Sequence, residues 1–289
     1  MIKTWSTPFV SEETRSVPCA LCGGRRFKPR FSCGSFSYVR CTRCGLVQIN
    51  PQPSGGAVLN RYQEGSGTGY LAYELANEKS FLALQEMGLA DAGFGELEGE
   101  LLQRAAAEGR KAEVLDIGCA TGALLRVLRE RGWRCRGIEI SPAAEYARRE
   151  RGLEVSGLPL EENRFREGAF DLALASHLIE HLNDPAGLVR EAYRILRPGG
   201  RFLVTTPNIA GFQARLFGGR WRSAIFDHLY LFSRRTLGAL LEEAGFTVER
   251  IVTWGGLAAG TAPAPLKKTA DRLVKRLGTG DVMLVRARK

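Results

Sequence analysis

Two carboxylates flank a glycine-rich turn near the middle of this 289-residue chain. Asp116 lies just before the turn at residues 118–122, and Glu139 follows 17 residues after Gly122. Glycine lets a backbone turn tightly and approach a ligand where a Cβ would collide. A carboxylate about 20 residues beyond such a turn can accept hydrogen bonds from ribose hydroxyls. These residues predict a nucleoside site, and the alternative is that the glycines serve only the turn.

The elements around the turn read as strand, helix and strand. Residues 114–117 are an apolar strand, residues 123–131 have the pattern of an amphipathic helix, and residues 133–140 are a second strand that ends near Glu139. Such units place ligands at the carboxyl ends of strands in doubly wound sheets. A dinucleotide fold usually spaces its glycines as G-x-G-x-x-G, whereas this turn reads G-x-A-x-G. The pattern therefore predicts a doubly wound α/β fold of another kind.

Four cysteines form a second constellation of two C-x-x-C pairs separated by 18 residues: Cys19, Cys22, Cys41 and Cys44. A glycine follows each pair, as a metal-knuckle turn favours. The spacing predicts a zinc ribbon in which four thiolates close a tetrahedron, so the zinc has a structural role. Disulfides are the alternative, which a cytoplasmic setting disfavours. We expect the remaining cysteines, Cys33, Cys119 and Cys135, to be buried as small apolar residues.

Further motifs continue the pattern after Glu139. They are Phe-Asp at 170–171 opening a strand, Glu-His at 180–181, Asp-Pro at 184–185 and R-x-L-x-P-G-G at 194–200. With Asp116, Glu139 and the G-x-A-x-G turn, they resemble class I S-adenosylmethionine-dependent methyltransferases over residues 114–254. The resemblance implies a Rossmann-like, mostly parallel seven-stranded sheet whose last strand, residues 281–286, is antiparallel.

The amino-terminal third is similar to the zinc-binding end of certain bacterial methyltransferases, some of which act on nucleotide-linked sugars and other secondary metabolites. The similar features are the two cysteine pairs, Asn-Pro-x-Pro at 50–53 and a segment with Tyr62, Tyr70 and Tyr73. In that family the tyrosine segment helps to cover the cofactor. Tyr70 is the best candidate for that role here, and the alternative is that these tyrosines only pack.

The resemblance implies a set of cofactor-binding residues: Asp116, Gly118, Cys119, Ala120, Gly122, Glu139, Ile140, Leu158, Ser176 and His177. The family more often has glycine at the position of Ala120, and alanine fits there if its φ is negative. The loop after residue 156 lacks the acidic residue that many members use to hold the adenine amine. Contacts at Leu158 would therefore be apolar or made by the backbone.

His181 is the first candidate for a general base, because imidazole has a pKa suited to accepting a proton near neutrality. His228 and Tyr70 are the competing candidates, and a purely structural His181 is the alternative. The segment His177-Leu-Ile-Glu180-His181 also matches the H-x-x-E-H motif of inverted zinc proteases. That motif belongs within a long helix, whereas this one directly follows a buried strand, so we reject the protease interpretation.

Residues 207–232 hold six aromatic side chains: Phe212, Phe217, Trp221, Phe226, Tyr230 and Phe232. Apolar walls with a few polar groups, here Asn208 and His228, suit an acceptor pocket. The alternative is a short aromatic-rich helix that packs on the sheet.

Length and composition predict the division into domains and the location of the protein. We predict a zinc ribbon at 1–50, a linker and helical lid at 51–110, and a methyltransferase domain at 111–289. No run of 18 apolar residues and no signal-peptide stretch occurs, which predicts a cytoplasmic protein without a membrane span. The sequence does not indicate the oligomeric state.

The net charge of +10 is concentrated at the two ends, because residues 1–50 and 262–289 each hold eight basic against two acidic residues. Such ends predict weak, non-specific nucleic-acid binding or are simply solvated. We therefore expect methyl transfer from S-adenosylmethionine to a small-molecule acceptor. The rivals are an RNA methyltransferase whose ribbon holds RNA, and a zinc-ribbon binding protein with an inactive methyltransferase body.

Overall fold

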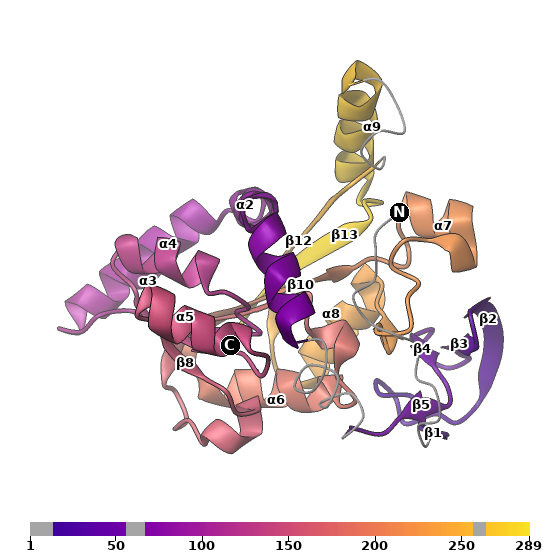
Figure 1. Cartoon of the computed structure of the whole chain (residues 1–289), viewed down its shortest axis with the longest axis horizontal. Coiled ribbons are helices and arrows are strands. Elements are labelled where there is room, and N and C mark those ends of the chain that lie inside the picture. Colours follow the sequence, from indigo (N-terminus) through magenta and orange to yellow (C-terminus); the bar gives the residue numbers. More distant parts are fainter. Residues whose placement is uncertain (1–13, 56–66, 257–263) are drawn as a thin grey trace.

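A seven-stranded sheet forms the centre of the computed structural model, which describes residues 14–55, 67–256 and 264–289 (Figure 1). Its strand order is β12-β13-β10-β9-β6-β7-β8. The strands are β6 (Glu113–Ile117), β7 (Arg134–Ile138), β8 (Glu154–Ser156), β9 (Phe170–Ser176), β10 (Leu196–Pro207), β12 (Thr247–Trp254) and β13 (Val282–Arg288). The pairs among β8, β7, β6, β9 and β10 are parallel, and β13 is antiparallel to both neighbours. The predicted fold class is confirmed, including the antiparallel last strand.

Helices cover both faces of this sheet (Figure 1). They are α2 (Gly67–Asp91), α3 (Phe94–Ala107), α4 (Ala123–Glu130), α5 (Ala143–Arg151), α6 (Pro185–Ile195), α7 (Phe212–Phe217), α8 (Arg234–Glu243) and α9 (Ala264–Leu277), with short turns η1 (Leu160–Asn163), η2 (Ile179–His181) and η3 (Gly218–Arg220). Side chains of β9 alternate between two apolar clusters. Leu172 and Leu174 pack with α3, α4 and α5, whereas Ala173 and Ala175 pack with α6 and α8. This two-residue alternation is what a strand buried on both faces requires.

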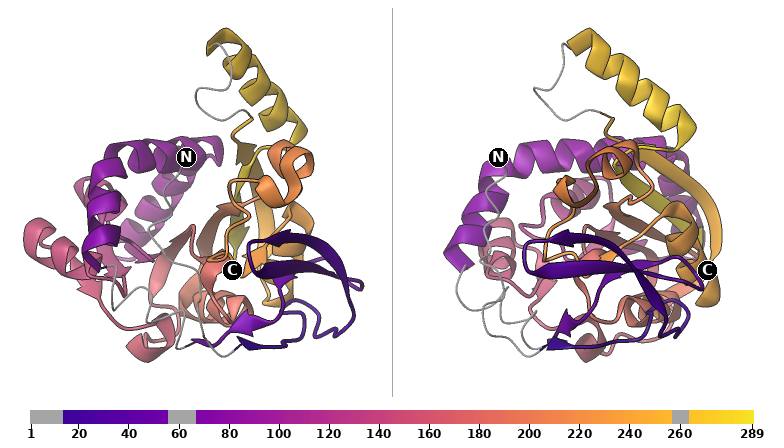
Figure 2. Two further views of the ribbon diagram at one scale, coloured as in Figure 1. Left: turned by 45° about the vertical axis from the view of Figure 1, so that its right-hand side comes forward. Right: turned by 90° about the vertical axis from the view of Figure 1, so that its right-hand side faces the viewer.

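The cysteine-bearing end folds into a small sheet beside the body (Figure 2). Its own strands are β2 (Phe27–Cys33), β3 (Phe36–Cys41) and β4 (Val47–Ile49), while β1 (Thr14–Arg15) pairs with β5 (Gln52–Pro53). The two glycines that follow the cysteine pairs, Gly23 and Gly45, have φ of 67° and 84°. Only glycine adopts such angles readily, so the expected knuckle turns are present.

The fourth strand of the small sheet comes from the body. Strand β11 (Tyr230–Leu231) pairs antiparallel with β4, so that Tyr230 lies opposite Gln48 and Leu231 opposite Val47. The hydroxyl of Tyr38 on β3 donates to the carbonyls of Ile225 and His228 at 2.6 and 2.8 Å. The ribbon therefore packs directly on the segment that precedes and includes β11.

The turn after β6 depends on Gly122, which precedes α4. This glycine has a φ of 74°, and a Cβ built on it would lie 2.4 Å from Leu153 Cδ1. Gly122 therefore serves the turn and the packing of α4 near the start of β8. At Gly152 φ is similarly positive, at 57°, but no atom lies within 4 Å of a built Cβ.

Gly122→Ala should destabilise the fold by about 2–4 kcal/mol, because it combines a left-handed backbone with steric overlap. The matched change Gly152→Ala has only the backbone penalty and should cost about 1 kcal/mol. Urea unfolding followed by circular dichroism measures both values. Equal losses in the two variants would contradict the overlap with Leu153.

Candidate functional site

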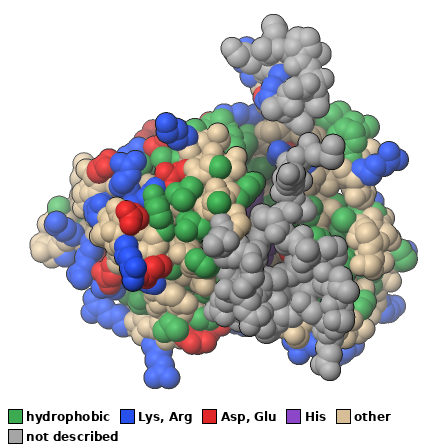
Figure 3. Space-filling model, viewed as in Figure 1, with side chains coloured by type: hydrophobic (Ala, Val, Ile, Leu, Met, Phe, Trp, Pro, Cys, Tyr) green, Lys and Arg blue, Asp and Glu red, His purple; other side chains and the backbone are tan. Residues whose placement is uncertain are grey.

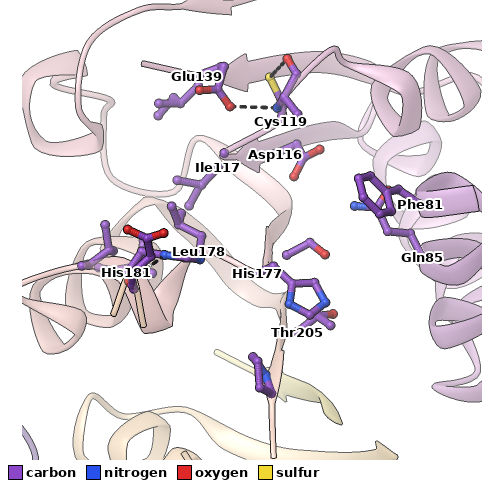
Figure 4. A pocket seen from close by; sticks show the side chains of 18 of the residues that line it. Phe81, Gln85, Asp116, Ile117, Cys119, Glu139, His177, Leu178, His181 and Thr205 are labelled. Atoms are coloured by element: carbon purple, nitrogen blue, oxygen red, sulfur yellow. Dashed lines mark hydrogen bonds between the residues drawn. The ribbon is translucent and has the colours of Figure 1, made fainter. Parts of the chain in front are cut away.

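A cavity of about 1260 Å³ lies at the carboxyl ends of β6, β7, β9 and β10 (Figure 4). Side chains from α2 face the strand ends across it, among them Phe81 and Gln85 in Figure 4. Polar side chains lie on the strand side, including Asp116, Glu139 and His177. Ligands of open α/β sheets bind at this edge.

The glycine-rich turn is tied to the end of β7. The backbone N–H groups of Gly118 and Cys119 both donate to the carbonyl of Ile138, at 2.8 and 3.0 Å. Ala120 has a φ of 46°, so the condition under which alanine would fit there, a negative φ, is not met. A left-handed alanine costs about 1–2 kcal/mol. The N–H of Ala120 donates to Glu139 Oε2 at 2.9 Å, a charge-assisted bond that helps to hold this conformation.

Glu139 is almost fully buried, and both of its carboxylate oxygens accept backbone hydrogen bonds. Oε1 accepts from Ser141 N at 2.8 Å, and Oε2 accepts from Ala120 N. Burial raises the pKa of Glu139 in spite of these bonds, which lower it. Each carboxylate oxygen retains acceptor capacity for a further donor.

Further carboxylates make this end of the cavity acidic. Burial and the nearby charge of Glu139 raise the pKa of Asp116 to about 7. Burial also raises the pKa of Glu74 on α2 to about 7, with a further contribution from Glu139. Glu78, one turn along α2, accepts from Thr121 Oγ1 at 2.6 Å and pairs with Arg151. A cation bound among these groups would relieve their mutual repulsion.

The other end of the cavity gathers all three histidines of the chain around Glu180. His181 Nδ1 donates to the carbonyl of Asp227 at 2.9 Å, and His228 Nδ1 donates to that of Ser223 at 2.8 Å. The two imidazole rings meet edge to face with centroids 4.7 Å apart. His177 is 48% exposed, and its Nδ1 lies 3.3 Å from Glu180 Oε1.

Two groups of this cluster, Glu180 and His228, have strongly shifted pKa values. Burial alone would raise the pKa of Glu180, but the neighbouring histidines lower it to about 2, so it is a carboxylate at neutral pH. Burial and the proximity of His181 lower the pKa of His228 to about 3. His228 is therefore neutral at pH 7 and a weak base.

Most of the residues predicted for the site line this cavity. They are Asp116, Gly118, Cys119, Ala120, Glu139, Ile140, Ser176 and His177, together with Tyr70, His181 and His228. Gly122 and Leu158 do not line it. Gly122 faces Leu153, and Leu158 is 49% exposed to solvent, while the next residues, Pro159 and Leu160, line the cavity. Tyr62 lies outside the described residues.

The segment at 207–232 lines the cavity, but through residues such as Gln213, Ser223 and His228 rather than through the aromatic walls that were expected. None of its six aromatic side chains lines the cavity; Trp221, Tyr230 and Phe232 are buried in the core, and Phe212 and Phe217 are about half exposed. The alternative interpretation, a short helix packed on the body, is closer to α7 and η3. The aromatic side chains that do line the cavity are Tyr70, Tyr73, Phe81 and Trp254.

Sequence reasoning missed the acidic residues of α2. Glu74 and Glu78 lie in the predicted linker and helical lid at 51–110, where a glutamate usually faces solvent, so no local signal singles them out. Their spacing of four residues does place both on one face. Only the packing of α2 across the strand ends brings that face to Asp116 and Glu139.

The four cysteines of the ribbon converge, with all four sulfur atoms within 4.8 Å of one another. Cys19 and Cys44 sulfurs are 3.3 Å apart, and those of Cys22 and Cys41 are 3.5 Å apart. All of them are free thiols rather than disulfides. Of the other cysteines, Cys119 is buried as expected, whereas Cys33 and Cys135 are only partly buried.

Among the helices that the structure describes, we find none with the length and apolar character needed to cross a lipid bilayer.

Residues 91–251, more than half of the chain, match the family model of the methyltransferase domain. The chain belongs to this family. It is an S-adenosylmethionine-dependent methyltransferase, built on the Rossmann-like fold described above.

Two individual relatives and one solved structure are similar to the chain. The chain is 32% identical over 164 residues to a ubiquinone biosynthesis O-methyltransferase of Pseudomonas aeruginosa, a match that covers 52% of this chain and 70% of that protein. It is 32% identical over 165 residues to a probable S-adenosylmethionine-dependent methyltransferase of Mycolicibacterium smegmatis, covering 56% of this chain and 63% of that protein. A possible histamine N-methyltransferase of Thermotoga maritima matches in structure with 24% identity and a TM-score of 0.49, over 73% of this chain and 97% of the other.

Asp116→Asn should stabilise the ligand-free protein at pH 8 but not at pH 5. The raised pKa means that folding favours the protonated form, so the wild type loses stability as the pH rises from about 4 through 7. The neutral asparagine removes that loss. Thermal unfolding at both pH values measures the difference, and an advantage that is equal at pH 5 and pH 8 would contradict the assigned pKa.

Proposed function

We propose that the enzyme transfers a methyl group to a small-molecule acceptor that binds beside S-adenosylmethionine in the one cavity. The observation that carries this proposal is the presence of two chemically different groups in one cavity, the carboxyl groups of Asp116, Glu139 and Glu74 and the imidazoles of His181 and His228 beside Glu180. A volume of about 1260 Å³ exceeds the 300–1,000 Å³ usual for a single small ligand. It leaves room for cofactor and acceptor together.

The acidic end suits the cofactor because S-adenosylmethionine is cationic at its sulfonium and ammonium groups. In the proposed arrangement Asp116 and Glu74 face these charges, and Glu139 uses its remaining acceptor capacity for the ribose hydroxyls. The glycine-rich turn lies beside the methionine part. The charge of Glu139 raises the pKa values of Glu74 and Asp116, and a bound cation would relieve this repulsion, which supports the arrangement.

The histidine end suits an acceptor that must lose a proton. The sulfonium supplies the driving force for transfer, so the protein's work is to align the acceptor with the methyl group and to help the proton leave. We assign to His181 the role of the general base that accepts the acceptor's proton. His228 is neutral and too weak a base, and Tyr70 lies on α2 at the other wall of the cavity.

The acceptor class is proposed from the relatives. The relatives from Pseudomonas aeruginosa are named as O-methyltransferases, which favours an oxygen nucleophile. The similarity of the amino-terminal motifs to enzymes of secondary metabolism favours a biosynthetic intermediate, and a nucleotide-linked sugar is one such candidate.

Methyl-labelled S-adenosylmethionine tests the function directly. The protein is incubated with the labelled cofactor and a cell extract, and the label is followed into small-molecule, RNA and protein fractions. We expect label in the small-molecule fraction.

Exposed basic residues on the ribbon, Arg25, Arg26, Lys28 and Arg30, favour RNA as the second candidate. On the face shown in Figure 3, Lys and Arg are instead interspersed with Asp and Glu over the body. Label confined to RNA would reverse the ranking.

Glu139→Ala should weaken the binding of S-adenosylmethionine by about 1.5–3 kcal/mol through the loss of charge-assisted hydrogen bonds. Glu130→Ala is the matched control, because Glu130 is an exposed carboxylate on α4 that does not line the cavity. Titration calorimetry measures both affinities. Equal affinities for the two variants would remove Glu139 from the cofactor site.

The ribbon is proposed to bind one structural zinc ion through its four cysteines, whose donor set and clustering fit tetrahedral coordination. Cys41→Ser should lose that zinc together with the fold of residues 15–50, because such sites contribute about 10–16 kcal/mol in isolated small domains. Metal analysis and limited proteolysis check both effects. A variant that keeps its zinc and resists proteolysis like the wild type would contradict the assignment.

A further inference from the structure

Glu180, His181 and His228 form a second cluster of metal-ligating side chains, separate from the cysteines. One ligand atom from each lies within 4.8 Å of the other two. Glu180 and His181 belong to η2, which follows β9, and His228 comes from the distant segment before β11. The methyltransferase proposal uses His181 for the proton but leaves Glu180 and His228 without a role.

The hydrogen bonds of the two imidazoles prepare them as metal ligands. Each donates from Nδ1 to a backbone carbonyl, His181 to Asp227 and His228 to Ser223. The proton therefore resides on Nδ1, and Nε2 has the lone pair. Metal-bound histidines in proteins almost always show this arrangement, in which the second nitrogen donates to a carbonyl or a carboxylate.

Glu180 has a buried oxygen that makes no hydrogen bond of regular geometry. The side chain is 0% exposed, and Oε2 accepts from Thr206 Oγ1 at 2.9 Å. Oε1 is buried without a hydrogen-bond partner among the described residues, since His177 Nδ1 at 3.3 Å does not have the geometry of a hydrogen bond. A buried carboxylate oxygen without a partner costs free energy unless a cation satisfies it.

We propose that Glu180, His181 and His228 bind a divalent transition-metal ion. Two imidazoles and one carboxylate are a ligand set of catalytic zinc sites, in which further positions stay open. Bonds of about 2.0–2.2 Å would require the three side chains to approach by on the order of an ångström. His181 and His228 line the cavity, so the open positions of the ion face the space assigned to the acceptor.

The chemical role of this ion rests on the proposed function. A hydroxyl oxygen of the acceptor binds at an open position, and the ion lowers the pKa of that hydroxyl. With the ion bound, His181 is a ligand and the ion replaces its role as base, so the proton leaves to water past His177, which is half exposed at the cavity. The oxygen's electron pair then forms the bond to the methyl carbon, and the pair of the broken carbon–sulfur bond stays on sulfur, which becomes a neutral thioether. The acceptor is therefore an alcohol or a phenol.

Metal content tests the site without reference to activity. Protein dialysed against a weak chelator is loaded with Zn²⁺, freed of excess ion and analysed for metal. The wild type should hold two equivalents, one of them in the ribbon. His181→Asn and His228→Asn should each lose the other, because asparagine can keep the donor to the carbonyl while Nε2 is absent. Glu180→Gln, which keeps the shape and loses the charge, should also lose it.

His177→Asn is the control and should hold both equivalents, because His177 is not in the ligand set. Circular dichroism identifies any variant that fails to fold. The metal content of the folded variants then shows whether the three side chains bind the second ion. One equivalent in the wild type, or two equivalents in all folded variants of the three ligands, would overturn the proposal. Calorimetry with S-adenosylmethionine separates the two claims. Cofactor binding without a second metal refutes only the metal site, and a second metal without cofactor binding refutes only the proposed function.

Discussion

The carboxylate of Glu139 is the interaction on which the arrangement of the cavity depends. Its two oxygens accept from Ala120 and Ser141, so one buried group joins the turn after β6 to the start of the segment after β7. The bond to Ala120 also holds an alanine in a left-handed conformation that it rarely adopts. This side chain therefore joins the turn to the segment after β7, in addition to the bonds from Gly118 and Cys119 to the carbonyl of Ile138.

The amino-terminal ribbon supports the opposite end of the cavity. The hydroxyl of Tyr38 donates to the carbonyls of Ile225 and His228, on either side of Asp227, whose own carbonyl accepts from His181. Strand pairing between β4 and β11 holds the same segment. The orientation of two imidazoles thus depends on a ribbon residue that donates to carbonyls 187 and 190 positions later in the chain, and loss of the ribbon fold would disturb the histidine end of the cavity.

The cavity combines two kinds of electrostatic strain. At one end, burial and proximity raise the pKa of two carboxyl groups, which favours a bound cation. At the other end, a buried carboxylate and a neutral buried imidazole lie side by side. Neither arrangement contributes to the stability of the empty protein, because each buries charge or keeps polar groups from water. Stability comes instead from the apolar clusters on the two faces of the sheet, and the cavity retains groups suited to ligands.

The sequence by itself determined the strands of the main sheet, the order of its elements and a group of predicted site residues, most of which line the cavity. Those features depend on local patterns, such as the apolar run before Asp116, the Ser233 cap of α8 and the positive-φ glycines after the cysteine pairs. Tertiary structure alone decided that Glu74 lines the cavity near Glu139, that Leu158 is exposed to solvent and that the aromatic segment packs on the core and ribbon. It also decided the left-handed φ of Ala120, which follows from the bond to Glu139. These outcomes depend on contacts between residues far apart in the chain, and no local pattern of residue types encodes such contacts.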